Sequence, residues 1–164
     1  MYDLTRLSPV DFETLALELL QAEWGHRLEA FKPGRDQGID LRYSCPQGTK
    51  TIIQCKHFAG SGLGVLRSHL RKTEIQKIRA LAPDRYVLFT SVPLSPANKA
   101  DIRSDLHPYV VDDLVIIGAD DIESFLRRHE TVELKTPKLW LTSVPVMQRV
   151  LHNAERLQAQ FEVE

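Results

Sequence analysis

The chain has 164 residues, of which 43% are hydrophobic and 26% charged, and a formal net charge of −1, as expected of one globular domain with its own core. Its two cysteines, Cys45 and Cys55, exclude a disulfide framework and a paired-cysteine zinc site. No apolar run is long enough to span a bilayer or to act as a signal peptide, so we expect a cytoplasmic protein without membrane contact.

Although the net charge of the whole chain is close to zero, one stretch in its first half is basic. Between residues 26 and 72 there are nine Lys and Arg residues against three acids. Such a local excess of positive charge indicates a polyanionic partner. A merely solvated basic surface is the simpler alternative.

The first predicted element is a helix that begins after Ser8. Ser8 is a suitable N-cap, Pro9 occupies the favoured first helical position, and Trp24 and Gly25 end the helix. Apolar residues recur at helical spacing and predict a core-facing stripe: Phe12, Leu15, Ala16, Leu19 and Leu20. Glu13 lies beside this stripe, so it either faces a cleft or complements the helix dipole.

A strand over residues 27–32 and a glycine-flanked turn over residues 34–40 are expected next, followed by a β-hairpin. Residues 51–53 are β-branched, and the sequence Cys-Pro-Gln-Gly at 45–48 suits the hairpin connection. Because side chains alternate along a strand, Gln54 and Lys56 share one face and Cys55 takes the other. An antiparallel pair would therefore bring Asp40 next to Gln54 and Lys56. A carboxylate, an amide oxygen and an ammonium group together suit phosphodiester hydrolysis.

The remaining elements alternate between helices and strands. A glycine-rich loop at 60–64 lacks the Lys-Ser/Thr of a phosphate-binding loop, and a helix over residues 65–82 follows it. Residues 86–90 predict a buried strand, 95–105 a helix capped by Ser95, 110–118 one further strand and 119–129 a helix that begins with acids. This order predicts an α/β domain with a central mixed sheet flanked by helices.

In the helix predicted over residues 65–82, apolar and basic side chains separate onto two faces. The apolar side chains predicted to point inward are Leu66, Leu70, Ile75 and Ile78. The basic side chains predicted to point outward are Arg67, Arg71 and Lys72.

The tail differs from this domain, which we place at residues 1–143. In residues 144–164 apolar positions step by three and four, a pattern typical of a coiled-coil seam: Met147, Val150, Ala154, Leu157 and Phe161. The pattern favours an amphipathic helix that links domains or forms a homo-oligomer. A helix that packs back on the domain is the alternative.

The sequence G-R-D-Q-G-I-D at 34–40, followed by Q-C-K at 54–56, resembles the Mrr-type restriction endonucleases of the PD-(D/E)xK superfamily. The match extends from the helix that carries Glu13 to the basic helix after Lys56. The resemblance implies a restriction-endonuclease-like fold and cleavage of double-stranded DNA that depends on Mg²⁺, for which Mn²⁺ can substitute. Gln54 stands where the superfamily has a second carboxylate, which is usual in the Mrr-like branch.

On this resemblance each matched residue receives an expected role. Asp40, Gln54, Glu13 and the main-chain carbonyl of Cys55 would hold the metal, while Lys56 would orient the attacking water and offset charge on the phosphate. Basic side chains would grip the DNA backbone without reading sequence: Lys32, Arg35, Arg67, Arg71 and Lys72. His57 follows Lys56 on the opposite face and is expected to be structural.

A second resemblance covers residues 117–122, 126–130 and 138–143, which look like nuclease modules fused at the N-terminus of STAND-type ATPases in bacterial antiphage defence. It implies an effector domain that works with an ATPase and sensor region. The alternative is a catalytically silent DNA-binding or assembly module. An RNA-directed nuclease ranks lower, because no aromatic stacking platform is apparent. In the simplest alternative Asp40 and Lys56 are solvated charges.

Overall fold

The computed structural model describes residues 2–31, 40–44, 48–58, 60–110, 112–140 and 152–154. Within these ranges the strands form one sheet in the order β1-β2-β3-β4-β5. Their bounds are β1 (Glu29–Ala30), β2 (Leu41–Ser44), β3 (Lys50–Lys56), β4 (Arg85–Thr90) and β5 (Ile116–Ile117). The first three strands pair antiparallel and the last three parallel, which confirms the predicted mixed sheet.

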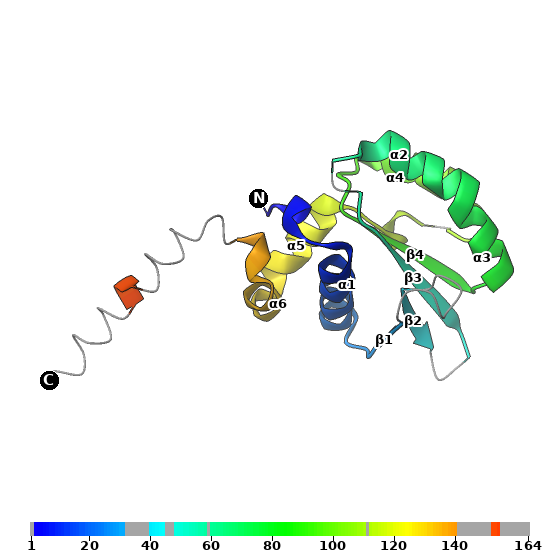
Figure 1. The fold of residues 1–164 in the computed structure, drawn as a ribbon. Coiled ribbons are helices and arrows are strands. Elements are labelled where there is room, and N and C mark those ends of the chain that lie inside the picture. Colours follow the sequence, from blue (N-terminus) through cyan, green and yellow to red (C-terminus); the bar gives the residue numbers. More distant parts are fainter. Residues whose placement is uncertain are drawn as a thin grey trace, which may run out of the picture.

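Helices cover both faces of this sheet (Figure 1). On one face lie α1 (Pro9–Trp24), α5 (Ala119–Arg128) and α6 (Glu130–Lys135), and on the other lie α2 (Gly62–His69), α3 (Ile75–Leu81) and α4 (Pro96–Asp105). Between the two layers, β3 and β4 are buried over nearly their whole lengths. Strands covered on both faces are typical of the parallel part of an α/β sheet, so the chain has the predicted α/β fold.

The helix boundaries follow the predicted capping residues. In α1 the Ser8 hydroxyl accepts the Asp11 main-chain N–H at 3.2 Å, and the Asp11 carboxylate accepts the Ser8 N–H at 2.9 Å. Gly25 ends α1 with φ of 67°, a left-handed conformation that glycine adopts without steric cost. Ser95 caps α4 in the same manner as Ser8.

Three predicted elements differ from the structure. The helix predicted over 65–82 is interrupted between α2 and α3 by a π-helical segment, η2 (Leu70–Glu74). The strand predicted at 27–32 is reduced to β1. The strand predicted at 110–118 is reduced to β5, which follows the 3-10 turn η3 (Asp113–Val115). Two further turns are η1 (Leu4–Arg6) and η4 (Pro137–Leu139).

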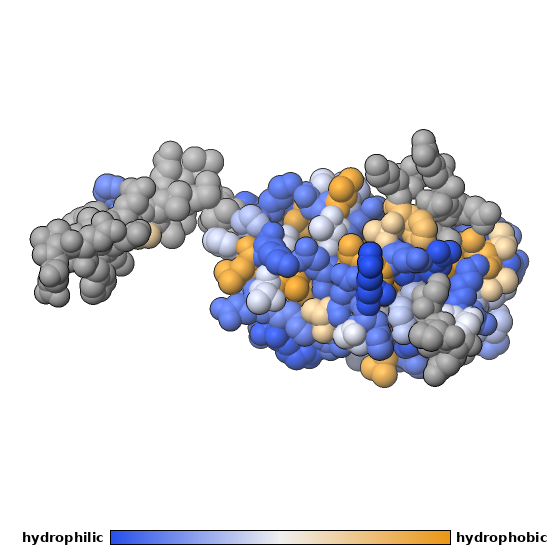
Figure 2. All heavy atoms as spheres, turned by 90° about the horizontal axis from the view of Figure 1, so that it is seen from below, coloured by the Kyte–Doolittle hydropathy of each residue, from blue (hydrophilic) through white to orange (hydrophobic). Residues whose placement is uncertain are grey.

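The amphipathic helix predicted over 144–164 falls outside the described residues, except for 152–154, which are helical. Among the residues that are described, no helix is both long and apolar enough to cross a membrane. Figure 2 shows one face of the molecule, on which hydrophilic residues predominate and hydrophobic ones form small separate groups. The large exposed hydrophobic residues are Val10, Val65, Leu114, Leu134 and Trp140.

Candidate active site

The hairpin brings Asp40 and Gln54 into direct contact. Asp40 immediately precedes β2, and its Oδ2 accepts hydrogen bonds from Gln54 Nε2 at 2.6 Å and from the Cys55 main-chain N–H at 2.8 Å. Burial raises the pKa of Asp40 above its ordinary value, and the Cys55 N–H and the charge of Lys56 offset part of this effect. The predicted proximity of Asp40 to Gln54 follows from the antiparallel register of Leu41 with Ile53.

Glu13 approaches the same place from the first helix. It is partly buried on α1, and its pKa is raised by desolvation and then by the negative charge of Asp40, with Lys56 acting in the opposite direction. Glu13 therefore shares an electrostatic environment with Asp40 and Lys56, although the three come from different elements. The prediction that it faces the site is favoured over a role limited to the helix dipole.

His57 attaches the end of β3 to the start of α1. Its Nε2 donates to the Leu7 carbonyl at 2.8 Å, and its ring stacks on Phe12 with 4.7 Å between ring centroids. Because a carbonyl can only accept, Nε2 carries the hydrogen. These two contacts place α1, and with it Glu13, against the strand that carries Lys56. His57 is thus a structural residue, as predicted.

Lys56 forms an ion pair that the sequence reasoning missed. Its Nζ lies 2.9 Å from Glu74 Oε2, with only 11% of the Lys56 side chain and 1% of the Glu74 side chain exposed. His69 Nε2 lies 3.5 Å from the same oxygen, and burial together with the charge of Lys56 lowers the pKa of His69. Lys56 is therefore not a solvated surface charge.

A signal for Glu74 was present in the sequence. Leu66, Leu70, Glu74 and Ile78 follow one another at intervals of four, so Glu74 occupies an inward position on a helix whose other residues in that row are apolar. Lys77, one turn after Glu74, was also missed. Its positive charge offsets a small part of the raised pKa of Asp40 and contributes to the lowered pKa of His69, so Lys77 acts electrostatically on both residues.

The donor groups suit a hard divalent cation. Burial raises the pKa of both Glu13 and Asp40, and the negative charge of Asp40 raises that of Glu13 further, so a cation between these carboxylates would favour their ionised forms. Within a strand the N–H and C=O of one residue point to the same side, so the Cys55 carbonyl is directed, like its N–H, toward Asp40. Burial raises the pKa of the Cys55 thiol, which leaves the carbonyl as its available donor.

Gln54 changes the character of this donor set. Its amide nitrogen donates to Asp40, which leaves its Oε1 as the remaining oxygen. Among the described residues, no three His, Cys, Asp or Glu side chains converge as ligands. The groups that could hold a metal are therefore Glu13, Asp40, the Cys55 carbonyl and Gln54 Oε1.

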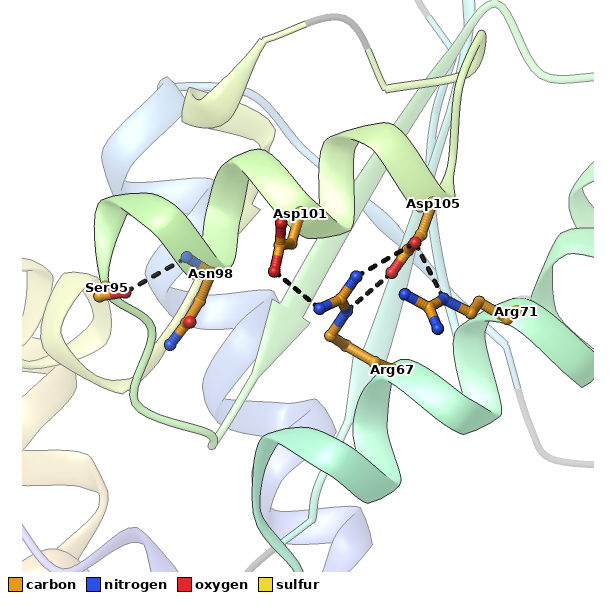
Figure 3. Close-up of polar contacts among 6 residues, drawn as sticks. All are labelled: Arg67, Arg71, Ser95, Asn98, Asp101 and Asp105. Atoms are coloured by element: carbon orange, nitrogen blue, oxygen red, sulfur yellow. Dashed lines mark hydrogen bonds and ion pairs between the residues drawn. The ribbon is translucent and has the colours of Figure 1, made fainter.

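Two of the predicted DNA-binding residues bind α4 instead of pointing freely into solvent (Figure 3). Arg67 donates to Asp105 from Nε at 2.8 Å and to Asp101 from Nη1 at 2.7 Å, and Arg71 Nε donates to Asp105 at 2.9 Å. Burial acts to raise the pKa of Asp105, but the two guanidinium groups lower it overall. Arg67 thus pairs with α4 while 23% of its side chain remains exposed, and its contact with DNA stays a prediction.

The other candidates for DNA contact are divided between described and undescribed parts. Lys72 is exposed on η2, and no ion pair is found for it within the described residues. Lys32 and Arg35 lie outside the described residues, as does the glycine-flanked turn over 34–39.

Comparison with known proteins shows the family to which this chain belongs. The profile of the Mrr_cat family, described as "Restriction endonuclease", matches residues 4–97, which include Glu13, Asp40, Gln54 and Lys56. The chain belongs to this restriction endonuclease family. A protein of Sinorhizobium fredii (strain NBRC 101917 / NGR234) named "Uncharacterized protein y4cD" is 43% identical over 155 residues. The match covers 94% of this chain but 24% of that relative, so the chain spans about a quarter of its length.

Proposed function

We propose that the protein is an Mg²⁺-dependent endonuclease that hydrolyses the phosphodiester bonds of double-stranded DNA. The observation that carries this proposal is the gathering of Asp40, Glu13 and Lys56 at one end of the β2–β3 hairpin in a chain of the restriction endonuclease family. Two carboxylates and one ammonium group suit a reaction in which negative charge accumulates on phosphate.

Each residue has a distinct part in this mechanism. Magnesium, when bound, supplies Lewis-acid activation of water and neutralisation of phosphate charge. Asp40 and Glu13 provide hard oxygen donors, and Gln54 and the Cys55 N–H fix the orientation of Asp40. Lys56 donates hydrogen bonds to the attacking water or to a phosphate oxygen, a contribution worth roughly 10²–10³ in rate where single donors have been removed.

Contact with the DNA backbone would come from basic side chains around this site. The candidates are Lys72 and Lys77, for which no ion pair with α4 is found among the described residues, together with Lys32 and Arg35, which lie outside those residues. Arg67 and Arg71 have Asp101 and Asp105 beside them, so we assign them mainly to holding α2 and α4 together. Phosphate contacts of this kind bind DNA without selecting sequence.

We further propose that this domain is the effector of a longer cytoplasmic protein in bacterial antiphage defence, fused to or working with a STAND-type ATPase. The support is the resemblance of residues 117–143 to such modules and the greater length of the Sinorhizobium relative. Residues 144–164 would link the domain to its neighbour or assemble homo-oligomers.

Cleavage of supercoiled plasmid tests the nuclease proposal. Wild type with Mg²⁺ or Mn²⁺ is expected to nick or linearise the plasmid, whereas EDTA or Asp40→Asn abolishes cleavage. Equal cleavage by wild type and Asp40→Asn would place the activity elsewhere. DNA binding without cleavage, at high protein concentration and with either metal, would favour a silent DNA-binding module.

A further inference from the structure

Glu74 is a buried carboxylate for which neither metal binding nor DNA contact accounts. Its side chain is 1% exposed and lies 2.9 Å from Lys56 and 3.5 Å from His69, and it also interacts with the buried hydroxyl of Tyr86. A buried charge is costly unless it is paired, so Glu74 requires the ammonium group of Lys56. The requirement is reciprocal, because the Lys56 side chain is itself only 11% exposed.

The backbone around Glu74 is also unusual. Glu74 is the last residue of η2, the π-helical segment between α2 and α3. Such segments are rare and occur frequently at functional sites. Here η2 ends with the carboxylate directed at Lys56, while Leu70 at its start and Ile75 after it remain in the core.

We propose that Glu74 is a positioning residue that fixes the Lys56 ammonium beside Asp40, an inference that rests on the nuclease function proposed above. Lysine has a flexible four-carbon stem, and an unrestrained ammonium would sample several positions. An ammonium has three donors, and Glu74 occupies one of them at a fixed distance. The other donors stay oriented toward the place where water and phosphate react.

A positioning role differs measurably from a purely structural one. Glu74 contacts Lys56 and is not one of the proposed metal ligands, so Glu74→Gln should lower kcat while the affinity for DNA stays nearly unchanged. Because Glu74→Gln also leaves Lys56 without its partner, it should lower thermal stability, so a purely structural role is recognised by a kcat per folded molecule that stays at the wild-type value. Glu23→Gln is the matched control: Glu23 also holds a cation and a histidine, Arg128 and His129, but on the opposite face of the sheet.

The experiment compares wild type, Glu74→Gln, Glu74→Asp and Glu23→Gln in two assays. In plasmid cleavage we expect Glu74→Gln to lower kcat by roughly 10²-fold with KM for DNA nearly unchanged, as for loss of a preorganised donor. Glu74→Asp, which keeps the charge, should recover part of kcat, and Glu23→Gln should cleave like wild type. A wild-type kcat in Glu74→Gln, or an equal loss in Glu23→Gln, would overturn the proposal.

The second assay does not depend on nuclease activity. Reductive methylation followed by peptide mass spectrometry measures how readily the Lys56 amine is reached, and Lys56 should react faster in Glu74→Gln than in wild type or Glu23→Gln. Equal labelling rates in all variants would mean that Glu74 does not hold Lys56. If wild type fails to cut DNA but the labelling rates differ as expected, the nuclease proposal fails while the Glu74–Lys56 clamp stands. Should Glu74→Gln lose its thermal unfolding transition, Glu74→Asp carries both readouts: its carboxylate is one methylene shorter, so kcat should fall and Lys56 labelling should accelerate relative to wild type, and wild-type values of both would overturn the proposal.

Discussion

At the scale of single residues, the site combines carboxylates whose ionisation the protein opposes. Burial and the charge of Asp40 raise the pKa of Glu13 above its ordinary value of 4.5. The folded state then binds more protons than the unfolded state between the two pKa values, so Glu13 lowers stability as pH rises through that window. Carboxylates whose ionisation is unfavourable in the metal-free protein are expected at a site where a bound cation would stabilise their charges.

Glu13→Gln is therefore expected to stabilise the metal-free protein at pH 7. The side chain is partly exposed and screened, so we expect a gain below about 1 kcal/mol, or about 1–3 °C in Tm. The gain should vanish below the ordinary glutamate pKa, where wild type is protonated in both states. Thermal melts in EDTA at several pH values measure it, and a destabilised variant at pH 7 would contradict the assignment.

Lys56 and Glu74 form a buried pair in which each charge depends on the other. Lys56→Ala leaves Glu74 buried without its partner and should destabilise the fold by about 3–5 kcal/mol. The double variant Lys56→Gln/Glu74→Gln removes both charges and should recover most of that loss. Urea denaturation checks both values. Inactivity of Lys56→Ala consequently bears on catalysis only where the variant is shown to be folded.

At the scale of elements, the start of α1 is fixed by more than its own cap. Asp11 accepts from the Ser8 main chain and hydroxyl, and Lys138 Nζ donates to its Oδ2 at 2.6 Å, which connects α1 to η4. Lys138 first, and Ser8 second, lower the pKa of Asp11 from 3.8 to about 2. This stabilisation is fully present above the unfolded pKa and is lost as pH falls toward about 2.

Asp11→Asn should accordingly reduce the free energy of unfolding by about 1 kcal/mol at pH 7, a typical value for a helix-terminal carboxylate and cap. Wild type and variant should converge as pH falls through the window between the two pKa values. Chemical denaturation at pH 7 and near pH 2 tests this. A constant difference at both pH values would show that the ionised carboxylate is not the source.

The basic residues of α2, η2 and α3 separate into those that hold the fold and those available to DNA. Arg67→Ala breaks contacts with both Asp101 and Asp105, and we expect it to lower the stability of the fold. Lys77→Ala should leave the free energy of unfolding nearly unchanged. It should reduce the number of counterions released on DNA binding by about one, measured as the slope of log K against log salt concentration. DNA-binding isotherms at several salt concentrations test the role of Lys77. An unchanged slope of log K against log salt concentration in Lys77→Ala would show that Lys77 does not contact DNA.

At the scale of the whole molecule, the core of the described residues extends from Leu4 to Leu139. If residues 144–164 serve as a linker or assembly helix and do not pack back on the domain, their removal should leave Tm within about 2 °C of that of the full chain, because the core of the described residues is retained. If that segment assembles subunits, the truncated protein should sediment as a monomer at concentrations where the full chain does not. Identical sedimentation of the two would contradict an oligomerisation role.

Local patterns in the amino-acid sequence were sufficient for α1, α4, α5 and the pairing of β2 with β3, but not for the π-helical interruption at η2 or for α6. Ser8 and Ser95 mark helix starts through bonds to residues three positions away, and strand alternation with a short connection brings Asp40 to Gln54. Such interactions lie within one element or one hairpin, where chain geometry leaves few choices. The family resemblance rests on the same residues.

Only the tertiary structure decided how the charged residues between Lys56 and Asp105 are used. The two parallel crossovers pack α2, η2, α3 and α4 on one face of the sheet, and this packing brings Arg67 to Asp105, 38 positions away, and Glu74 to Lys56. Periodicity shows which side of a helix is apolar but does not show which helix lies opposite. For that reason Arg67 could be taken for a DNA contact, and Glu74 could be missed, until the packing of the helices was known.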